Sequence, residues 1–343
     1  MDFLEGLSQQ GAFLKNPDGT LLIGTGGQLD ILKDFQKAEA GVFFIKDFYT
    51  ESFLRYAPQE TFSLSPAEQA ELMKRLPDVS PSVTSLGTED ETYKEDFRDL
   101  KKNLSGQFRK AVLISRETFK AQDPISPLHY FKKALSFGAG IPYGLWGKDF
   151  GIVGSTPEEL FDIRDGELHT YALAGTSKAQ DGDFLLHSEK DRYEHDLVIQ
   201  DIVEKLDSFT DRINTGETRI VSFKNISHLR TDISAAVAPD LDLHALVCAL
   251  SPTAALGGYP KKESLRFLRQ SRYGKKFPER AFGSAMGFVS PEDSRFIVMI
   301  RNIQWRKDQV FIECGGGVVH SSELPQELEE IGWKRRLVRE HYL

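Results

Sequence analysis

The sequence predicts an α+β fold in which large antiparallel β-sheets carry helices on their outer faces. Residues 150–175 form a meander of short apolar runs with a turn at Asp165-Gly166, and such close connections pair strands antiparallel. Residues 284–314 contain a second series of strands, with a turn at Lys307-Asp308. The helical patterns cluster between these regions instead of alternating with single strands, which argues against a parallel βαβ sheet.

The N-terminal region precedes the first long helix. Residues 11–46 are expected to form short strands around a turn at Asn16-Pro17-Asp18-Gly19. The stretch from Pro77 to Glu91, rich in Pro, Ser, Thr and acidic residues, is typical of a loop. We therefore divide the chain into an N-terminal segment, residues 1–85, integrated into the fold, and a core of residues 86–343.

The core begins with an amphipathic helix, because apolar side chains recur there at spacings of four and three: Tyr93, Phe97, Leu100 and Leu104. The expected elements that follow, in chain order, are the strands Lys110–Ile114, Gly151–Gly154, Leu160–Arg164 and Leu168–Leu173, a helix at 186–207, a strand at 219–223, a helix at 242–250, a loop at 253–260, the strands 284–290, 295–305 and 309–314, and a terminal helix from about residue 325.

Composition restricts the class of protein. The chain has 343 residues, of which 40% are apolar and 27% charged, as in ordinary globular proteins. A net charge of −8 argues against nucleic-acid binding, which normally needs a basic face. No apolar run reaches the roughly 18 residues of a membrane span and Met1–Glu5 has no basic residue, so we expect a cytoplasmic protein without a membrane partner.

The two cysteines, Cys248 and Cys314, lack the spacing of metal ligands and are expected to be free thiols. The protein is expected to be a monomer.

Two predicted helices carry acidic faces. Asp191 and Glu194 are three residues apart and share one helix face, and Glu327, Glu330 and Lys334 share another. Solvated, salt-bridged faces explain such patterns adequately. The alternative is a shared Mg²⁺ site, because Mg²⁺ takes one or two carboxylates together with waters and substrate oxygens.

Several other polar or glycine-rich positions are open to two explanations. The run Gly315-Gly316-Gly317 and the turn Ala174-Gly175-Thr176 are either tight connections or places where backbone N–H groups bind an anion. Lys110 and Glu158 are equally ambiguous by themselves. Arg301 follows an apolar strand and offers a guanidinium fork for a carboxylate.

In this order, the segments resemble the chorismate-utilising enzymes: isochorismate synthase, salicylate synthase and the large subunits of anthranilate synthase and aminodeoxychorismate synthase. The resemblance runs from about Lys110 to the C-terminus and implies the fold of anthranilate synthase component I. The blocks that carry it are Arg109–Leu113, Thr156–Glu158, Leu173–Thr176, Glu189–His195, His228-Leu229, Ser251–Pro260, Ile300-Arg301 and Gly315–Lys334.

The resemblance implies a role for each candidate residue. Glu194 and Glu330 would hold Mg²⁺, with Asp191 and Glu327 close behind them. Lys110 would be the general base and Glu158 the general acid. The residues that would bind the substrate chorismate are Gly175, Thr176, His228, Arg301, Gly315, Gly316, Gly317 and Lys334.

The chemistry of the implied reaction explains these residue types. Chorismate is a dianion with a hydroxyl group at C4, and isochorismate forms when water enters at C2 while that hydroxyl leaves and the double bonds shift. Hydroxide is a poor leaving group and water a weak nucleophile, so the reaction needs an acid and a base. Burial would raise the pKa of Glu158 enough for it to act as the acid near neutral pH.

A few positions favour isochorismate synthase within the family. Ala174 stands where aminodeoxychorismate synthase has a nucleophilic lysine, anthranilate synthase lacks the equivalent of Lys110, and Pro252–Leu256 resembles the menaquinone-type isochorismate synthases. A salicylate synthase and a non-catalytic chorismate-binding protein remain the alternatives. The segment Arg280–Ser284 departs from the family pattern, with Phe282 in place of a tyrosine, which puts substrate contacts from that loop in doubt.

Overall fold

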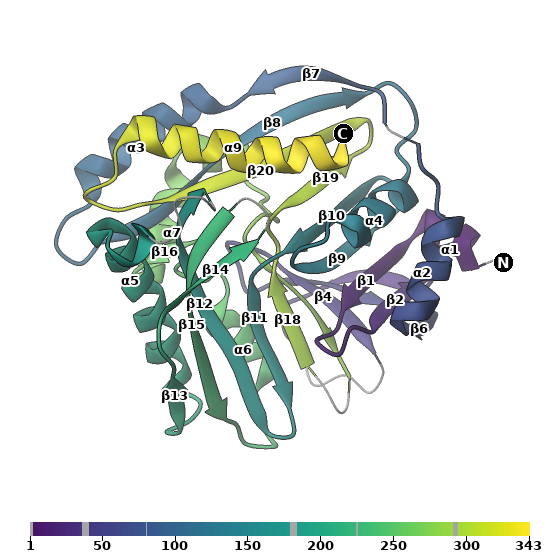
Figure 1. Ribbon diagram of the computed structural model, residues 1–343, viewed down its shortest axis with the longest axis horizontal. Coiled ribbons are helices and arrows are strands. Elements are labelled where there is room, and N and C mark those ends of the chain that lie inside the picture. Colours follow the sequence, from purple (N-terminus) through teal and green to yellow (C-terminus); the bar gives the residue numbers. More distant parts are fainter. Residues whose placement is uncertain (1–2, 36–40, 80, 179–183, 224–225, 291–293) are drawn as a thin grey trace.

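The computed structural model describes residues 3–35, 41–79, 81–178, 184–223, 226–290 and 294–343. Within them, two antiparallel sheets lie face to face and helices cover the outer faces (Figure 1). The predicted α+β class is confirmed. Residues 36–40, which belong to the predicted range 11–46, lie outside the described residues.

The first sheet, sheet A, brings N-terminal strands together with the longest strands of the core. Its strands, in spatial order, are β16 (Gly258–Tyr259), β8 (Lys110–Ala121), β20 (Gln309–Val318), β19 (Asn302–Arg306), β10 (Phe150–Thr156), β9 (Ile141–Trp146), β1 (Gly11–Lys15), β2 (Leu21–Thr25) and β6 (Glu60–Leu64), with β7 (Val83–Thr88) paired to β8.

The second sheet, sheet B, is also mixed in origin. Its strands, in spatial order, are β13 (Ile213–Thr215), β15 (Ile226–Ala236), β12 (Glu167–Lys178), β11 (Glu159–Arg164), β18 (Ser294–Val298), β17 (Ala285–Val289), β4 (Val42–Lys46), β5 (Phe53–Ala57) and β3 (Gln28–Leu32), with β14 (Arg219–Phe223) paired to β15. The first 85 residues thus contribute strands to both sheets, and the boundary expected at residue 85 falls inside β7.

The helices bury their apolar sides against the sheets. The helices on sheet A are α3 (Asp90–Asn103), α4 (Pro127–Ser136), α7 (Lys261–Gln270) and α9 (Leu324–Tyr342), and those on sheet B are α5 (Glu189–Leu206) and α6 (Leu243–Leu250). The shorter helices are α1 (Phe3–Gln9), α2 (Pro66–Arg75) and α8 (Arg272–Lys276). Figure 1 shows α9 lying along β20 and α5 beside β12. Among the described residues, no helix has the length and apolar character needed to cross a membrane.

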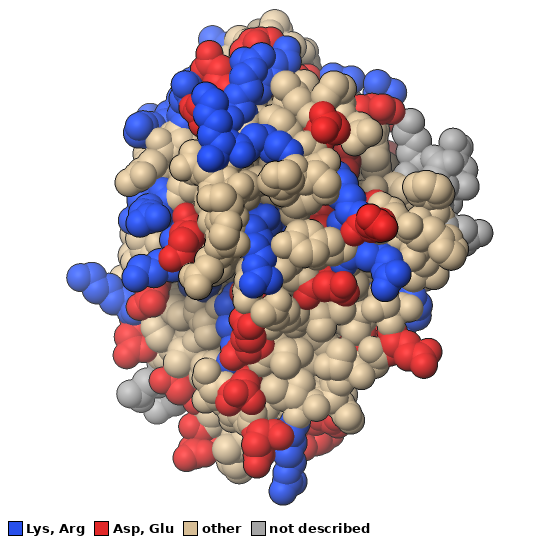
Figure 2. Space-filling view, turned by 90° about the vertical axis from the view of Figure 1, so that its left-hand side faces the viewer, with Lys and Arg blue, Asp and Glu red and all other residues tan. Residues whose placement is uncertain are grey.

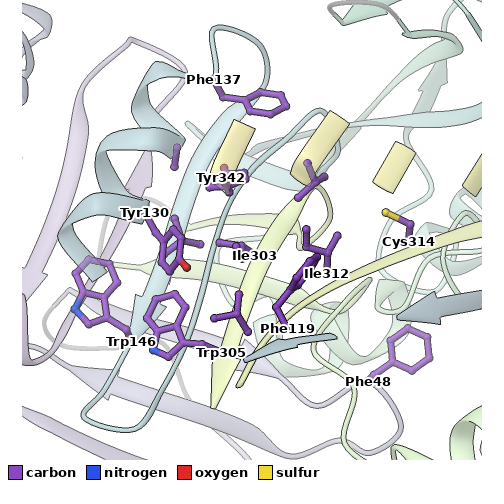
Figure 3. Packing of buried hydrophobic residues seen from close by; sticks show 14 of the residues in the cluster. Phe48, Phe119, Tyr130, Phe137, Trp146, Ile303, Trp305, Ile312, Cys314 and Tyr342 are labelled. Atoms are coloured by element: carbon purple, nitrogen blue, oxygen red, sulfur yellow. The ribbon is translucent and has the colours of Figure 1, made fainter. Parts of the chain in front are cut away.

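Three apolar clusters hold these layers together. One lies between the sheets and includes Phe43, Tyr143 and Met286, which are fully buried. The second fills the space between sheet B and its helices. The third lies under α3, α4 and α9, where the ring centroids of Tyr130 and Trp305 are 5.3 Å apart (Figure 3). Because both faces of each sheet are covered in this way, polar residues buried at the sheets need partners or a function.

Two of the points where the chain crosses between the sheets are adjacent. Glu158 lies between β10 in sheet A and β11 in sheet B, and Arg301 lies between β18 in sheet B and β19 in sheet A. The amide of Val298 donates to the carbonyl of Glu158 at 3.0 Å, and the amide of Ser155 donates to the carbonyl of Arg301 at 3.3 Å. The two crossings are therefore hydrogen-bonded to each other. Arg301 adopts φ 52°, an uncommon conformation for a residue with a side chain.

Three sequence predictions are corrected here. The single strand expected at 295–305 is two strands in different sheets, since its apolar residues are buried throughout and show no break in pattern. The loop expected from Pro77 to Glu91 contains β7 and the start of α3, because β7 is an exposed edge strand without apolar alternation. The loop expected at 253–260 contains the two-residue strand β16.

Candidate active site

An open cavity, whose volume of about 770 Å³ includes space open to solvent, lies where these two crossing points, β20, α5 and α9 meet. Ten of the predicted site residues line it: Glu158, Gly175, Thr176, Glu194, His228, Arg301, Gly315, Gly317, Glu330 and Lys334. Apolar side chains complete the wall, among them Val112, Ile226, Leu256, Phe282 and Leu337.

Four predicted residues lie behind the lining. Lys110 is fully buried at the start of β8, and Glu327 is 1% exposed. A Cβ atom on Gly316 would lie 2.7 Å from Glu327 Oε2, so this glycine faces the carboxylate and not the cavity. Asp191 packs against Gly175, whose added Cβ would lie 3.2 Å from the Asp191 Cβ.

Glu158 is a buried carboxyl group that faces the cavity. The hydroxyl of Thr253 donates a hydrogen bond to its Oε1 at 3.1 Å. Burial raises the pKa of Glu158 to about 7, even though Thr253, Lys110, Lys334 and Arg301 all act to lower it. A large fraction of Glu158 is thus protonated at neutral pH, as a general acid requires.

Arg301 and His228 form a pair on the cavity wall. The Nη2 group of Arg301 donates to Nε2 of His228 at 2.9 Å, so the proton of a neutral His228 ring lies on Nδ1. This Nδ1 is 3.2 Å from the Thr176 hydroxyl and 3.3 Å from the Gly175 carbonyl. Burial and the Arg301 charge keep the pKa of His228 well below its usual range. The Nη1 group of Arg301 has no hydrogen-bond partner among the described residues and is available to an anion.

Glu194 links α5 to the buried lysine of β8. Its Oε1 lies 2.9 Å from Lys110 Nζ and forms an ion pair with it. The geometry of this pair does not meet the criteria for a hydrogen bond, and Lys110 Nζ has no hydrogen-bond acceptor in the described part of the chain. Burial acts to raise the pKa of Glu194, but Lys110 and Lys190 outweigh it and the pKa is lowered. A Cβ atom on Gly317 would overlap Glu194 Oε1 and Lys110 Cε, so a side chain at this position would have to displace these two groups.

The acidic face of α9 lies next to the same cavity. Lys334 donates to Glu330 Oε1 at 2.6 Å and to the Gly315 carbonyl at 3.3 Å. Lys190 of α5 donates to Glu327 Oε1 at 2.7 Å, which ties the two acidic helices together. Burial and the nearby Glu330 raise the pKa of Glu327 to about 7. The acidic faces predicted from the sequence therefore meet.

The carboxylates at this junction fit a divalent cation. Glu194 and Glu330 both line the cavity, and among the described residues the lysines that pair with them engage the Oε1 atom of each. Burial is the largest cause that raises the pKa of Glu327 and of Asp191, and the charges of Glu194 and Glu330 raise both further. In the part of the chain that the structure describes, no three His, Cys, Asp or Glu side chains converge as a metal-binding group. Mg²⁺ usually keeps several waters and takes only one or two protein carboxylates.

Some residues of the site were not singled out from the sequence. Thr253 and Lys190 lie in predicted blocks, but only the fold shows that they bond to Glu158 and Glu327. Arg280, in the segment that departs from the family pattern, is buried and donates to the carbonyls of Phe282 and Leu256. The ring of Phe282 lines the cavity, whereas Arg280 lies behind it.

Charged side chains of both signs cover the molecular surface. On the face that Figure 2 shows, Lys and Arg side chains gather near the top, and basic and acidic side chains are interspersed below them. The basic groups relevant to an anionic ligand are instead Arg301 and Lys334 inside the cavity.

Comparison with known proteins identifies relatives. Residues 57–340 match a family model described as chorismate binding enzyme. Isochorismate synthase MenF of Pasteurella multocida is 28% identical over 246 residues, which is 68% of this chain and 56% of that protein. The salicylate biosynthesis isochorismate synthase of Pseudomonas aeruginosa is 32% identical over 199 residues, 55% of this chain and 41% of that protein. The alignments thus cover about half the length of these curated relatives.

A solved structure shows the same fold. It is that of MenF, the menaquinone-specific isochorismate synthase from Escherichia coli, with a TM-score of 0.82 over all of this chain and 92% of that chain. The sequence identity is 19%, so this likeness concerns the fold. The predicted architecture of large antiparallel sheets with helices packed outside agrees with it.

Proposed function

Because the chain belongs to the chorismate-binding enzyme family, we propose that it is an isochorismate synthase, which converts chorismate into isochorismate with Mg²⁺. The observation that carries the proposal is Glu158, a buried carboxyl group with a pKa of about 7 that shares one cavity with Arg301 and Lys334. An acid beside two cationic groups suits the departure of a hydroxyl from a dianion. The MenF relatives favour menaquinone biosynthesis as the pathway that uses the product.

Glu158 is the proposed general acid. Its Oε1 accepts from Thr253, so the proton is carried by the other oxygen, Oε2. Transfer of this proton to the C4 oxygen of chorismate lets that oxygen leave as water. The double bonds shift as water enters at C2, so one water is added and one is lost.

Lys110 is the proposed general base for the water that enters at C2. Its Nζ atom lies 2.9 Å from Glu194 Oε1, so this base would lie beside one of the two carboxylates proposed to hold Mg²⁺.

Arg301, Lys334 and the backbone of Gly315 and Gly317 are proposed to bind the substrate carboxylates. All of them line the cavity, and Arg301 Nη1 has no hydrogen-bond partner in the part of the chain that the structure describes. Glu194 and Glu330 would hold Mg²⁺, which neutralises carboxylate charge when bound. The apolar wall formed by residues such as Leu256 and Leu337 excludes water from the ring of the substrate.

Product analysis tests the proposal. The protein is incubated with chorismate and Mg²⁺, and the products are separated by liquid chromatography. Isochorismate as the main product is expected, and EDTA should stop the reaction. Salicylate with pyruvate would assign a salicylate synthase instead, and no product from a folded protein that binds chorismate would indicate a non-catalytic binding protein.

A further inference from the structure

Tyr93 of α3 has a buried hydroxyl group that the proposed mechanism does not use. The side chain is fully buried, and its Oη has no hydrogen-bond partner among the described residues. From the sequence, Tyr93 is simply one member of the apolar stripe of its helix. A buried hydroxyl without a partner is unfavourable, so its retention calls for a reason.

The surroundings of this hydroxyl are acidic. Tyr93 Oη and Glu327 Oε2 both lie within 4 Å of one point, the position that a Cβ atom would occupy on Gly316. Burial and the charges of Glu327, Glu330 and Glu194 raise the pKa of Tyr93 well above its usual value. The hydroxyl therefore stays protonated and remains a hydrogen-bond donor next to carboxylates.

Glu327 has one oxygen that Lys190 does not engage. Lys190 donates to Oε1, and it is Oε2 that lies near Gly316 and Tyr93. A rotation of the Glu327 side chain, or a bridging water, would join Tyr93 Oη to this oxygen. Tyr93 also lies within the electrostatic influence of Glu194 and Glu330, the two carboxylates that line the cavity.

We propose that Tyr93 is a positioning residue of the cation site, whose hydroxyl donates to Glu327 when Glu194 and Glu330 bind a divalent cation. The hydrogen bond favours the ionised form of Glu327 and fixes its orientation toward the waters of the cation. Groups behind metal ligands typically change metal affinity by 10- to 100-fold. The inference rests on the proposed function in one respect, the use of Glu194 and Glu330 as ligands.

The variant Tyr93→Phe removes only the hydroxyl group. Mg²⁺ binding is measured by titration calorimetry without chorismate, and Mn²⁺ binding by electron paramagnetic resonance. We expect the Kd of the variant to rise about 10-fold over that of the wild type. Without added cation, its Tm should be equal to or above that of the wild type, because the hydroxyl has no partner there.

Tyr130→Phe is the matched control. Tyr130 is 1% exposed and its hydroxyl also lacks a partner in the described part of the chain, but it packs against Trp305 and Tyr342 (Figure 3). This variant should bind Mg²⁺ with the wild-type Kd.

Two results would overturn the role of Tyr93 and leave the cation site intact. One is an unchanged Kd for Mg²⁺ in Tyr93→Phe; the other is a drop of several degrees in the Tm of Tyr93→Phe without cation that Tyr130→Phe does not show. Absence of cation binding in the wild type would overturn the cation site itself and this inference with it. A 10-fold rise in Kd at unchanged Tm supports both.

Discussion

Replacing Glu158 with glutamine should change how the stability of the protein depends on pH. Burial raises the pKa of Glu158 from 4.5 to about 7. Between these values the folded protein holds a proton that the unfolded chain has released, so the contribution of Glu158 to stability is fully present below pH 4.5 and is lost as the pH rises through 7. At about 1.4 kcal/mol per pKa unit, the loss amounts to about 3 kcal/mol. Glutamine does not titrate and avoids this loss.

The assay compares urea unfolding at pH 5 and pH 8. The free energy of unfolding of Glu158→Gln, relative to the wild type, should increase by up to about 3 kcal/mol between the two values. The control is Glu71→Gln, an exposed carboxylate whose replacement should shift stability by less than about 0.5 kcal/mol at either pH. If the difference between Glu158→Gln and the wild type is the same at pH 5 and pH 8, Glu158 does not titrate as described.

The enzymatic activity of Glu158→Gln tests the proposed acid independently of stability. The amide keeps the size of the side chain and can still accept from Thr253, but it has no acidic proton to donate. Turnover of chorismate should fall at least about 100-fold, even at pH 5, where the wild-type carboxyl is protonated. Wild-type turnover should decrease above pH 7 as Glu158 ionises.

Three further changes follow from the site. Lys110→Ala should lower the turnover of chorismate at least about 100-fold, because the proposed base is removed. Calorimetry should show equal or tighter Mg²⁺ binding, because Lys110 no longer competes for Glu194; weaker Mg²⁺ binding would contradict this. Arg301→Lys should raise the KM for chorismate about 10-fold in steady-state assays, since lysine cannot bond His228 and a carboxylate with one planar fork; an unchanged KM would exclude Arg301 as an anion contact. Gly317→Ala should weaken Mg²⁺ binding and lower the Tm, as its methyl group displaces Glu194; wild-type values for both would show that the strand can shift.

The sequence predicted those helices and strands that bury only one side, because their buried and exposed residues then alternate at a regular spacing. The two acidic helices, α5 and α9, were predicted because Asp191 and Glu194, and likewise Glu327 and Glu330, recur at helical spacing. The pattern cannot show that the faces meet, since that depends on how two sheets stack. The ion pair between Lys190 and Glu327 is the contact that joins them.

Other features have no local signal. The break at Arg301 lies inside an apolar run because both flanking strands are buried, so periodicity shows one strand where there are two. Lys110 at the start of a strand would normally be solvated, but the structure buries it completely. The apolar stripe places Tyr93 in the core without indicating what its hydroxyl faces.

The proposed acid and the proposed cation ligands are held by different parts of the fold. Glu158 and Arg301 lie on crossings that are hydrogen-bonded to each other, which fixes the backbone of the acid relative to that of the anion-binding group. Glu194 and Glu330 lie on helices that pack on different sheets, α5 on sheet B and α9 on sheet A. A slide of one sheet over the other would change the spacing of these carboxylates before it disturbed the acid. A cation shared by Glu194 and Glu330 would therefore hold α5 and α9, and with them the two sheets, in a fixed relative position.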